Sequence, residues 1–419
     1  MTVPISPRYF FILACALVIG GCATIPNDEP LDAGAAAFYQ TSANPVDGNN
    51  ASIGLMGLSA PTGQDFMAYG RALAAQPIAF TLAAAQRRSE VPNALTVKWS
   101  QERMNCWTDD YAPLDLDPKC APIEEAIQTL QDNAELLRRY QSVLKLPAAS
   151  GFIQAGGVRS IEMAKLTAVA IKVALRQGRS EEAYRTWANQ YAFWRRMNAV
   201  GRTWVEVAIG LVNEGHGLSG IESLLFRSPQ LIDKHYDELI SLISPEGIAR
   251  FNFPGIMRAE YALVMRAYEA EENRAALLPN YVTNRHYRYA QQVLEVARKP
   301  ASTLNETGEN RCKCLKPIEL NASDPRFSAS AEFIGPSVHL GTFELIKSMY
   351  DKNRRMALLS MRIRLFKERV PDSQIAAYLI ANAANMLEPF TDGPMRWDQG
   401  KRVLFFDNPN NRGTTEGRL

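Results

Sequence analysis

Residues 161–198 read IEMAKLTAVAIKVALRQGRSEEAYRTWANQYAFWRRMN and carry the clearest structural signal in the chain. Apolar residues recur there every three or four positions, which is the spacing of one face of an α-helix. Residues that favour helices dominate the composition, and Gly178 interrupts the pattern once. The stretch therefore predicts two helices, 161–177 and 180–198, joined by a tight turn.

This helix pair is similar to one unit of a tetratricopeptide repeat. The similarity rests on Leu166, Ala170, Leu175, Gly178, Glu181, Glu182 and Ala183. A repeat array would show further copies at a period of about 34 residues, and the sequence has none. The pattern favours an irregular array of helix hairpins or a bundle over a regular solenoid.

Helical periodicity extends over most of the chain, so we expect a mainly α-helical (all-α) fold. Further helices are predicted at 65–85, 123–144, 203–226, 229–243, 254–276 and 340–369. In the last of these, the apolar stripe consists of Met356, Leu359, Ile363 and Phe366. Prolines stand near several of the boundaries, and short connections favour antiparallel neighbours.

Two regions depart from the helical pattern. Residues 300–337 are rich in Asn, Pro and Ser, which predicts a long surface loop and a candidate subdivision of the domain 51–419. Within 389–407, two apolar runs flank Asp398-Gln399-Gly400-Lys401, a turn whose Gly400 can adopt a positive φ. This second region predicts a small β-hairpin.

The N-terminus has the layout of a bacterial secretory signal. Arg8 precedes an apolar run that ends near Ile19, and this run is too short to span a bilayer comfortably. Ile19-Gly20-Gly21-Cys22 resembles the lipobox of bacterial lipoproteins, in which the cysteine takes a diacylglyceryl group. We expect residues 1–21 to be a cleaved signal peptide and Cys22 to be lipidated; an ordinary signal peptide is the alternative.

The lipobox also implies an address for the protein. Ala23 after the cysteine favours retention at the outer membrane, with the domain facing the periplasm. Two acyl chains hold a protein on a membrane far more firmly than one. Residues 22–50 are rich in Pro, Asn, Asp and Ala, so we expect a flexible tether between the anchor and the folded domain.

Composition limits the classes of partner and site. Lys and Arg (46) nearly balance Asp and Glu (44), which gives no argument for nucleic acid. The exported domain keeps Cys106, Cys120, Cys312 and Cys314, an even number that predicts disulfides in an oxidising compartment. A four-cysteine zinc site is the alternative, although neither pair has the usual spacer. We expect no metal and no cofactor.

Five stretches together resemble a family of proteobacterial cell-envelope proteins without an assigned reaction. They are 49–70, 133–140, 193–197, 278–284 and 389–397, the last reading Pro-Phe-Thr-Asp-Gly-Pro-Met-Arg-Trp. They cover most of the exported chain in order. The resemblance implies an envelope location and a helical fold with a C-terminal hairpin, and it implies no chemistry.

Two groups of polar residues are candidate binding surfaces. Asn280, Asn284, His286 and Tyr287 combine amide and ring groups that could bind a ligand or a strand, although helix capping and core packing would explain them equally well. Arg354 and Arg355 belong to a basic run on the late helix, which could face anionic lipid or an acidic partner. Such runs are more often solvated helix faces.

No catalytic constellation stands out, so we expect a non-enzymatic scaffold or a module that binds an envelope protein. The four histidines are widely separated, and His216 lies in Glu214-Gly215-His216-Gly217, where the glycines allow close backbone approach. The alternative is an envelope or peptidoglycan hydrolase with an acidic catalytic residue. A deep cleft with a buried carboxylate would favour the enzyme, and a shallow groove would favour the module.

Overall fold

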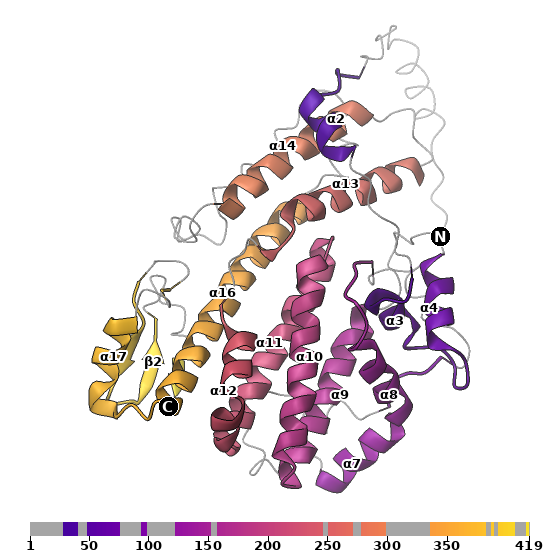
Figure 1. Ribbon diagram of the computed structural model, residues 1–419. Coiled ribbons are helices and arrows are strands. Elements are labelled where there is room, and N and C mark those ends of the chain that lie inside the picture. The colour runs from indigo at the N-terminus through magenta and orange to yellow at the C-terminus, as the bar shows by residue number, and fades with distance from the viewer. Residues whose placement is uncertain are drawn as a thin grey trace, which may run out of the picture.

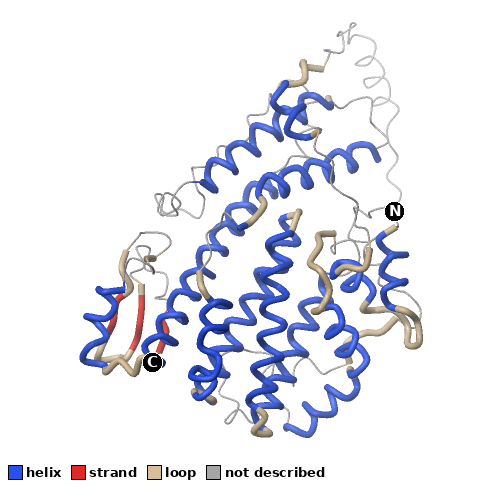
Figure 2. Tube along the Cα trace, viewed as in Figure 1, coloured by secondary structure: helices blue, strands red, loops and turns tan. Residues whose placement is uncertain are grey.

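A computed structural model describes residues 28–40, 48–75, 94–98, 122–151, 157–245, 250–270, 278–298, 336–382, 387–388, 393–406 and 416–418. The chain is mainly helical, with a small antiparallel sheet near the C-terminus, which confirms the predicted fold class (Figures 1 and 2). The signal peptide, Cys22, the other four cysteines of the exported domain and most of the predicted loop at 300–337 lie outside the described residues.

The predicted helix pair forms α9 (Gly157–Arg176) and α10 (Ser180–Val200). Gly178 joins them with a φ of +74°, a conformation that costs glycine little because it has no Cβ. The amide of Arg179 donates to the carbonyl of Ala174 at 2.8 Å, which closes the end of α9. The pair packs against α11 (Trp204–Arg227) and α12 (Gln230–Ile243) around Trp187, and this forms the core of the bundle.

The predicted helix 123–144 is two helices, α7 (Ile123–Asp132) and α8 (Ala134–Val143). Asn133 separates them because its side chain is used in another contact. Its amide nitrogen donates to the carbonyl of Lys98 at 2.7 Å, and its amide oxygen accepts from the amide of Lys98 at 2.9 Å. The break therefore has a tertiary cause that helical periodicity does not reveal.

Two short helices precede α8 in the sequence: α3 (Ala51–Gly57) packs on α8, and α4 (Phe66–Ala74) packs on α3. Every residue of α3 is buried, and α3 packs into a cluster with Tyr140 and Trp194. This packing brings the start of the predicted domain at residue 51 into the core.

A second layer consists of α13 (Phe253–Ala270), α14 (Pro279–Arg298) and the first half of α16 (Pro336–Lys367). These helices share a buried cluster with the start of α11, which includes Trp204, Phe253 and Tyr289. In Figure 1 this layer extends away from α7–α10, and α16 runs from it past α12 toward the C-terminal sheet. With 32 residues, α16 is about 48 Å long.

The apolar stripe predicted on α16 is correct except at its end. Met356, Leu359 and Ile363 are buried in the bundle core, whereas Phe366 is 45% exposed. The helix ends at Lys367, one residue later, so Phe366 lies where α16 leaves the core.

The C-terminal sheet has the order β1 (Arg396–Asp398), β2 (Val403–Phe405) and β3 (Glu416–Arg418), with both pairs antiparallel. The predicted hairpin is β1–β2, in which Trp397 lies opposite Leu404. The positive φ in its turn is at Arg402, and not at the expected Gly400. The sheet and α17 (Ile375–Asn382) pack on the second half of α16.

Candidate functional site

The polar residues predicted as a binding surface on α14 lie together, and a segment of the same chain occupies them. This segment, residues 28–40, contains the short helix α2 (Ala33–Tyr39) and crosses the first turns of α14 (Figure 1). Asn284 donates to Glu29 Oε1 at 2.7 Å and to the Pro30 carbonyl at 2.9 Å, and its oxygen accepts from the Asp32 amide at 2.8 Å. We call residues 28–40 the N-terminal strap.

The strap also caps the beginning of α14. The carboxylate of Asp28 accepts from the amides of Asn280 (2.6 Å) and Tyr281 (3.1 Å), and Asn280 Nδ2 donates to the Glu29 carbonyl at 3.0 Å. The first amides of a helix have no partner within the helix, and they carry the positive end of its dipole. A carboxylate from a distant part of the chain therefore stabilises α14.

Aromatic rings hold the other end of the strap. Tyr39 stacks on Tyr261 of α13 with ring centroids 3.8 Å apart, and its hydroxyl is 2.6 Å from His286 Nδ1. Phe38 lies 5.6 Å from Tyr287, and its carbonyl accepts from Arg258 Nε at 2.8 Å. Burial raises the pKa of Tyr39 well above its usual range, so its hydroxyl stays protonated in this contact.

The strap belongs to the range 22–50, for which the sequence predicts a flexible tether. Residues 28–40 are instead folded and docked on α14. The carboxylate of Asp28 and the rings of Phe38 and Tyr39 give this part of the range specific partners. The structure thus groups Asn280, Asn284, His286 and Tyr287 into one seat for a peptide segment.

The other predicted surface residues, Arg354 and Arg355, are not part of this seat and do not form an exposed basic face. Arg354 is 6% exposed, and its Nε lies 2.8 Å from the buried carboxylate of Glu388. Arg355 donates to Ser219 Oγ of α11 at 2.6 Å. The expectation that these two residues face lipid or an acidic partner is therefore wrong, because Glu388 and Phe406 pack on Arg354 and α11 packs on Arg355.

A second polar centre lies between α11 and α16, around Glu214. Its side chain is completely buried and accepts from Asn198 Nδ2 (2.5 Å), Arg250 Nη2 (2.7 Å) and Lys352 Nζ (2.5 Å). Burial by itself would raise the pKa of Glu214, but the charges of Lys352 and Arg250 outweigh it and hold the pKa below its ordinary value. Glu214 is therefore a fixed carboxylate, and not a poised acid or base.

Sequence reasoning did not find this centre, although a signal for it exists. Glu214 lies three residues after one buried apolar residue of α11 and four before the next, and Lys352 has the same spacing on α16. The buried series are Val207, Leu211, Glu214, Leu218, Ile221 on α11 and Met349, Lys352, Met356, Leu359, Ile363 on α16. One charge in each of two apolar stripes indicates a buried ion pair where the stripes meet.

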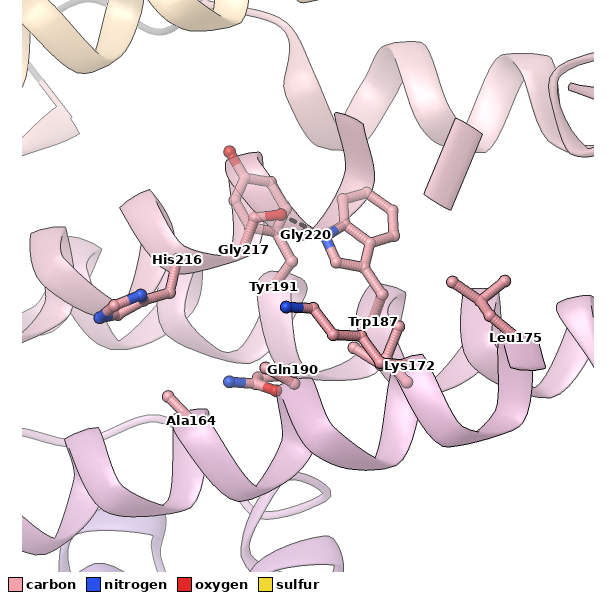
Figure 3. A pocket seen from close by; sticks show the side chains of 11 residues that line it. Ala164, Lys172, Leu175, Trp187, Gln190, Tyr191, His216, Gly217 and Gly220 are labelled. Carbon is pink, nitrogen blue, oxygen red and sulfur yellow. Dashed lines mark hydrogen bonds between the residues drawn. The ribbon is translucent and has the colours of Figure 1, made fainter. Parts of the chain in front are cut away.

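A small hollow lies beside this centre, between α9, α10 and α11 (Figure 3). Its volume is about 30 Å³, which is room for about two water molecules. Trp187 and Tyr191 stack in its wall, and Trp187 Nε1 donates to the Gly217 carbonyl at 2.7 Å. Gly217, one of the two glycines beside His216, allows the Tyr191 ring to pack closely against α11. A Cβ at this position would lie 2.6 Å from the ring.

The hollow is far below the several hundred Å³ that a small-molecule site needs. Glu260 of α13 has the environment closest to that of a catalytic acid, since burial raises the pKa of its carboxyl group. However, Glu260 Oε1 accepts from the amide of Trp204 at 2.8 Å, at the beginning of α11. Among the residues that the structure describes, no three His, Cys, Asp or Glu side chains gather as metal ligands.

The chain matches no family model, no curated protein and no solved structure. The resemblance to the envelope family therefore stays a prediction. Within the described ranges, no helix combines the length and apolar character needed to cross a bilayer.

Proposed function

We propose that this protein is a lipid-anchored lipoprotein of the outer membrane, whose helical domain acts as a non-enzymatic scaffold or binding module for another envelope protein. The observation that carries the proposal is the docked strap. Asp28 follows the lipobox cysteine, Cys22, by only six residues, and it caps α14 directly. An anchor at Cys22 would thus be joined to a packed part of the domain.

Two further observations support a role without chemistry. The charges of Lys352 and Arg250 neutralise the buried carboxylate of Glu214, and a hydrogen bond from Asn198 helps to fix it, so that it is held in its ionised form. The hollow beside it holds little more than solvent. Both features favour a framework that presents a surface to a partner.

The anchor is tested by comparing the full chain with its Cys22→Ser variant in cells labelled with radioactive palmitate. We expect label and sedimentation with outer membranes for the parent chain, and neither for the variant. A labelled Cys22→Ser chain, or an unlabelled parent chain, would refute the lipoprotein assignment.

The scaffold is tested by crosslinking the same two chains in cells, followed by affinity capture and identification of the captured proteins. A defined envelope protein captured with the parent chain, and lost with Cys22→Ser, is expected. Capture of peptidoglycan fragments alone would favour the alternative, an envelope hydrolase.

Among the residues that the structure describes, Glu260 is the one that favours the hydrolase, because burial raises the pKa of its carboxyl group and a raised pKa suits a general acid. The purified parent chain and Glu260→Gln are therefore incubated with peptidoglycan, and soluble fragments are measured. Fragments released by the parent chain and not by Glu260→Gln would replace the scaffold with an enzyme.

A further inference from the structure

We infer that the α2–α14 end of the protein faces the lipid bilayer and that the α7–α10 bundle points away from it. This inference rests on the proposed lipid anchor at Cys22, and it adds a fixed orientation to that anchor. The interacting surface is the strap with the first turns of α14, and the partner is the lipid surface that holds the acyl chains.

The first step is the reach of the chain. Asp28 is six positions after Cys22, with five residues between them. A fully extended chain spans at most about 3.3–3.6 Å per residue, so Asp28 lies within about 20 Å of the lipidated cysteine. This limit holds for any conformation of the residues between them.

The second step is the attachment of the strap to α14. Asp28 bonds to two amides, and Asn284 bonds to Glu29, Pro30 and Asp32. Gly34 lies so close to α14 that a Cβ there would be 2.7 Å from the Tyr287 hydroxyl. Hydrogen bonds at one end of the strap and stacked rings at the other hold it on α14. The maximum distance between Cys22 and Asp28 therefore also limits how far the beginning of α14 can lie from the lipidated cysteine.

The third step is the rigid connection of α14 to the rest of the protein. Tyr289, Val293 and Leu294 of α14 are buried with Phe253 of α13 and Met349 of α16 in one apolar cluster. From Met349 to its end at Lys367, α16 continues for about 27 Å into the bundle core. Figure 1 shows α2 and α14 at one end of the molecule and α7 at the other. An anchor beside α14 therefore sets the direction of the whole domain.

Most lipoproteins with a loose tether can rotate freely above the membrane, since a flexible linker of n residues spans about 5–6 Å times the square root of n. Here the docked strap begins at Asp28, six positions after Cys22, whereas the expected tether extends over the whole range 22–50. The consequence is that one surface stays near the lipid headgroups, and the bundle is presented to partners further from the membrane.

The orientation is tested on the full chain purified from membranes with its lipid and reconstituted into vesicles of phosphatidylethanolamine and phosphatidylglycerol. A small donor dye is placed at Arg288 of α14 or at Gln131 of α7, both of which are exposed. A genetically encoded azide residue carries the dye, so the native cysteines are left unchanged. Energy transfer to an acceptor on the lipid headgroups is then measured.

We expect transfer from position 288 to exceed transfer from position 131 several-fold. The double variant Asp28→Ala/Asn284→Ala releases the strap and should bring the two positions close to equal transfer. The matched control is Asp65→Ala, which removes a similar carboxylate cap from α4, where Asp65 accepts from Met67 and Ala68, and should keep the contrast.

The possible results separate this inference from the proposed function. A vesicle-bound chain with equal transfer from both positions, or with more transfer from position 131, overturns the orientation and leaves the lipoprotein assignment intact. Persistence of the contrast after release of the strap overturns the role of the strap. A purified chain that carries no lipid and does not bind the vesicles overturns both.

Discussion

The polar groups of α14 and the basic groups of α16 have different kinds of partner. On α14, amide side chains and the helix terminus bind the backbone and acidic side chains of the strap, about 250 residues away in sequence. On α16, Lys352, Arg354 and Arg362 pair with carboxylates of the surrounding structure.

The two sets of contacts differ in energy because they differ in burial: the strap on α14 is partly exposed, whereas the ion pairs on α16 are more deeply buried. Neutral hydrogen bonds contribute about 1 kcal/mol each to stability, and those to a charged group such as Asp28 or Glu29 contribute about 1.5–3 kcal/mol. A half-exposed segment held by such bonds can open locally. A buried charge that loses its partner costs about 3–5 kcal/mol, since nothing replaces its solvation. The α14 contacts therefore hold a surface segment through many separate weak bonds, whereas the α16 contacts are buried ion pairs between packed elements of the protein.

The largest effect is expected for Glu214→Gln, which leaves Lys352 and Arg250 buried without their carboxylate. The free energy of unfolding should fall by about 3–5 kcal/mol in urea titrations followed by circular dichroism. The control on the same helix is Glu222→Gln. Glu222 lies 3.8 Å from Arg362 and is 29% exposed, so its loss should cost about 1 kcal/mol or less. Equal losses for both variants would contradict a special role for Glu214.

The parent chain and Glu214→Gln should also differ in how their stability depends on pH. The pKa of Glu214 in the folded protein lies below its ordinary value of 4.5, so its carboxylate stabilises the fold above that pH. This contribution is lost as the pH falls through the lowered pKa. The stability difference between the parent chain and Glu214→Gln should therefore shrink below pH 4.5, and a constant difference would refute the assignment.

An intermediate effect is expected for Asn284→Ala, which removes three hydrogen bonds to the strap. Amide hydrogen exchange of peptides from 28–40 should become faster, by an amount equivalent to about 1–3 kcal/mol of local opening. The matched control is Asn133→Ala, because Asn133 clamps the backbone of Lys98 in the same way. That variant should leave exchange in the strap unchanged, and unchanged exchange in Asn284→Ala would show that the strap is held by other contacts.

The smallest effect is expected for Lys367→Ala, at the exposed end of α16. Lys367 Nζ lies 3.3 Å from Asp233 Oδ1, and both side chains are accessible to solvent. Removal of such a pair should change the free energy of unfolding by about 1 kcal/mol or less. Lys352→Ala, on the buried part of the same helix, serves as the comparison and should cost several times more. If Lys367→Ala lowered the free energy of unfolding as much as Lys352→Ala, the distinction between the exposed end and the buried part of α16 would be wrong.

Most of the fold could be predicted because helical periodicity is a local property. The turn at Gly178, the α9–α10 pair and the β1–β2 hairpin follow from residues close together in sequence. The break at Asn133 and the third strand could not be predicted in this way. Asn133 interrupts a good helical pattern for a contact with Lys98, and β3 joins the sheet from a separate segment.

The candidate site was predicted only in part. Asn280, Asn284, His286 and Tyr287 were selected for their chemistry, and they do lie together, but their chemistry did not show what occupies them. Glu214 could not be selected in this way, because its neighbours in sequence do not show that it is paired. Its partner, Lys352, is 138 residues away, and only the pairing of two apolar stripes reveals it.

The sequence by itself determined the helical class, the main turns and the lipobox pattern, because each of these depends on spacing within a few residues. Only the tertiary structure decided which polar groups face each other. It turned a predicted tether into the docked strap, and it turned a predicted basic surface into an internal seam. The physical reason is that a charge or an amide finds its partner through the packing of distant helices, and periodicity within one helix does not specify that packing.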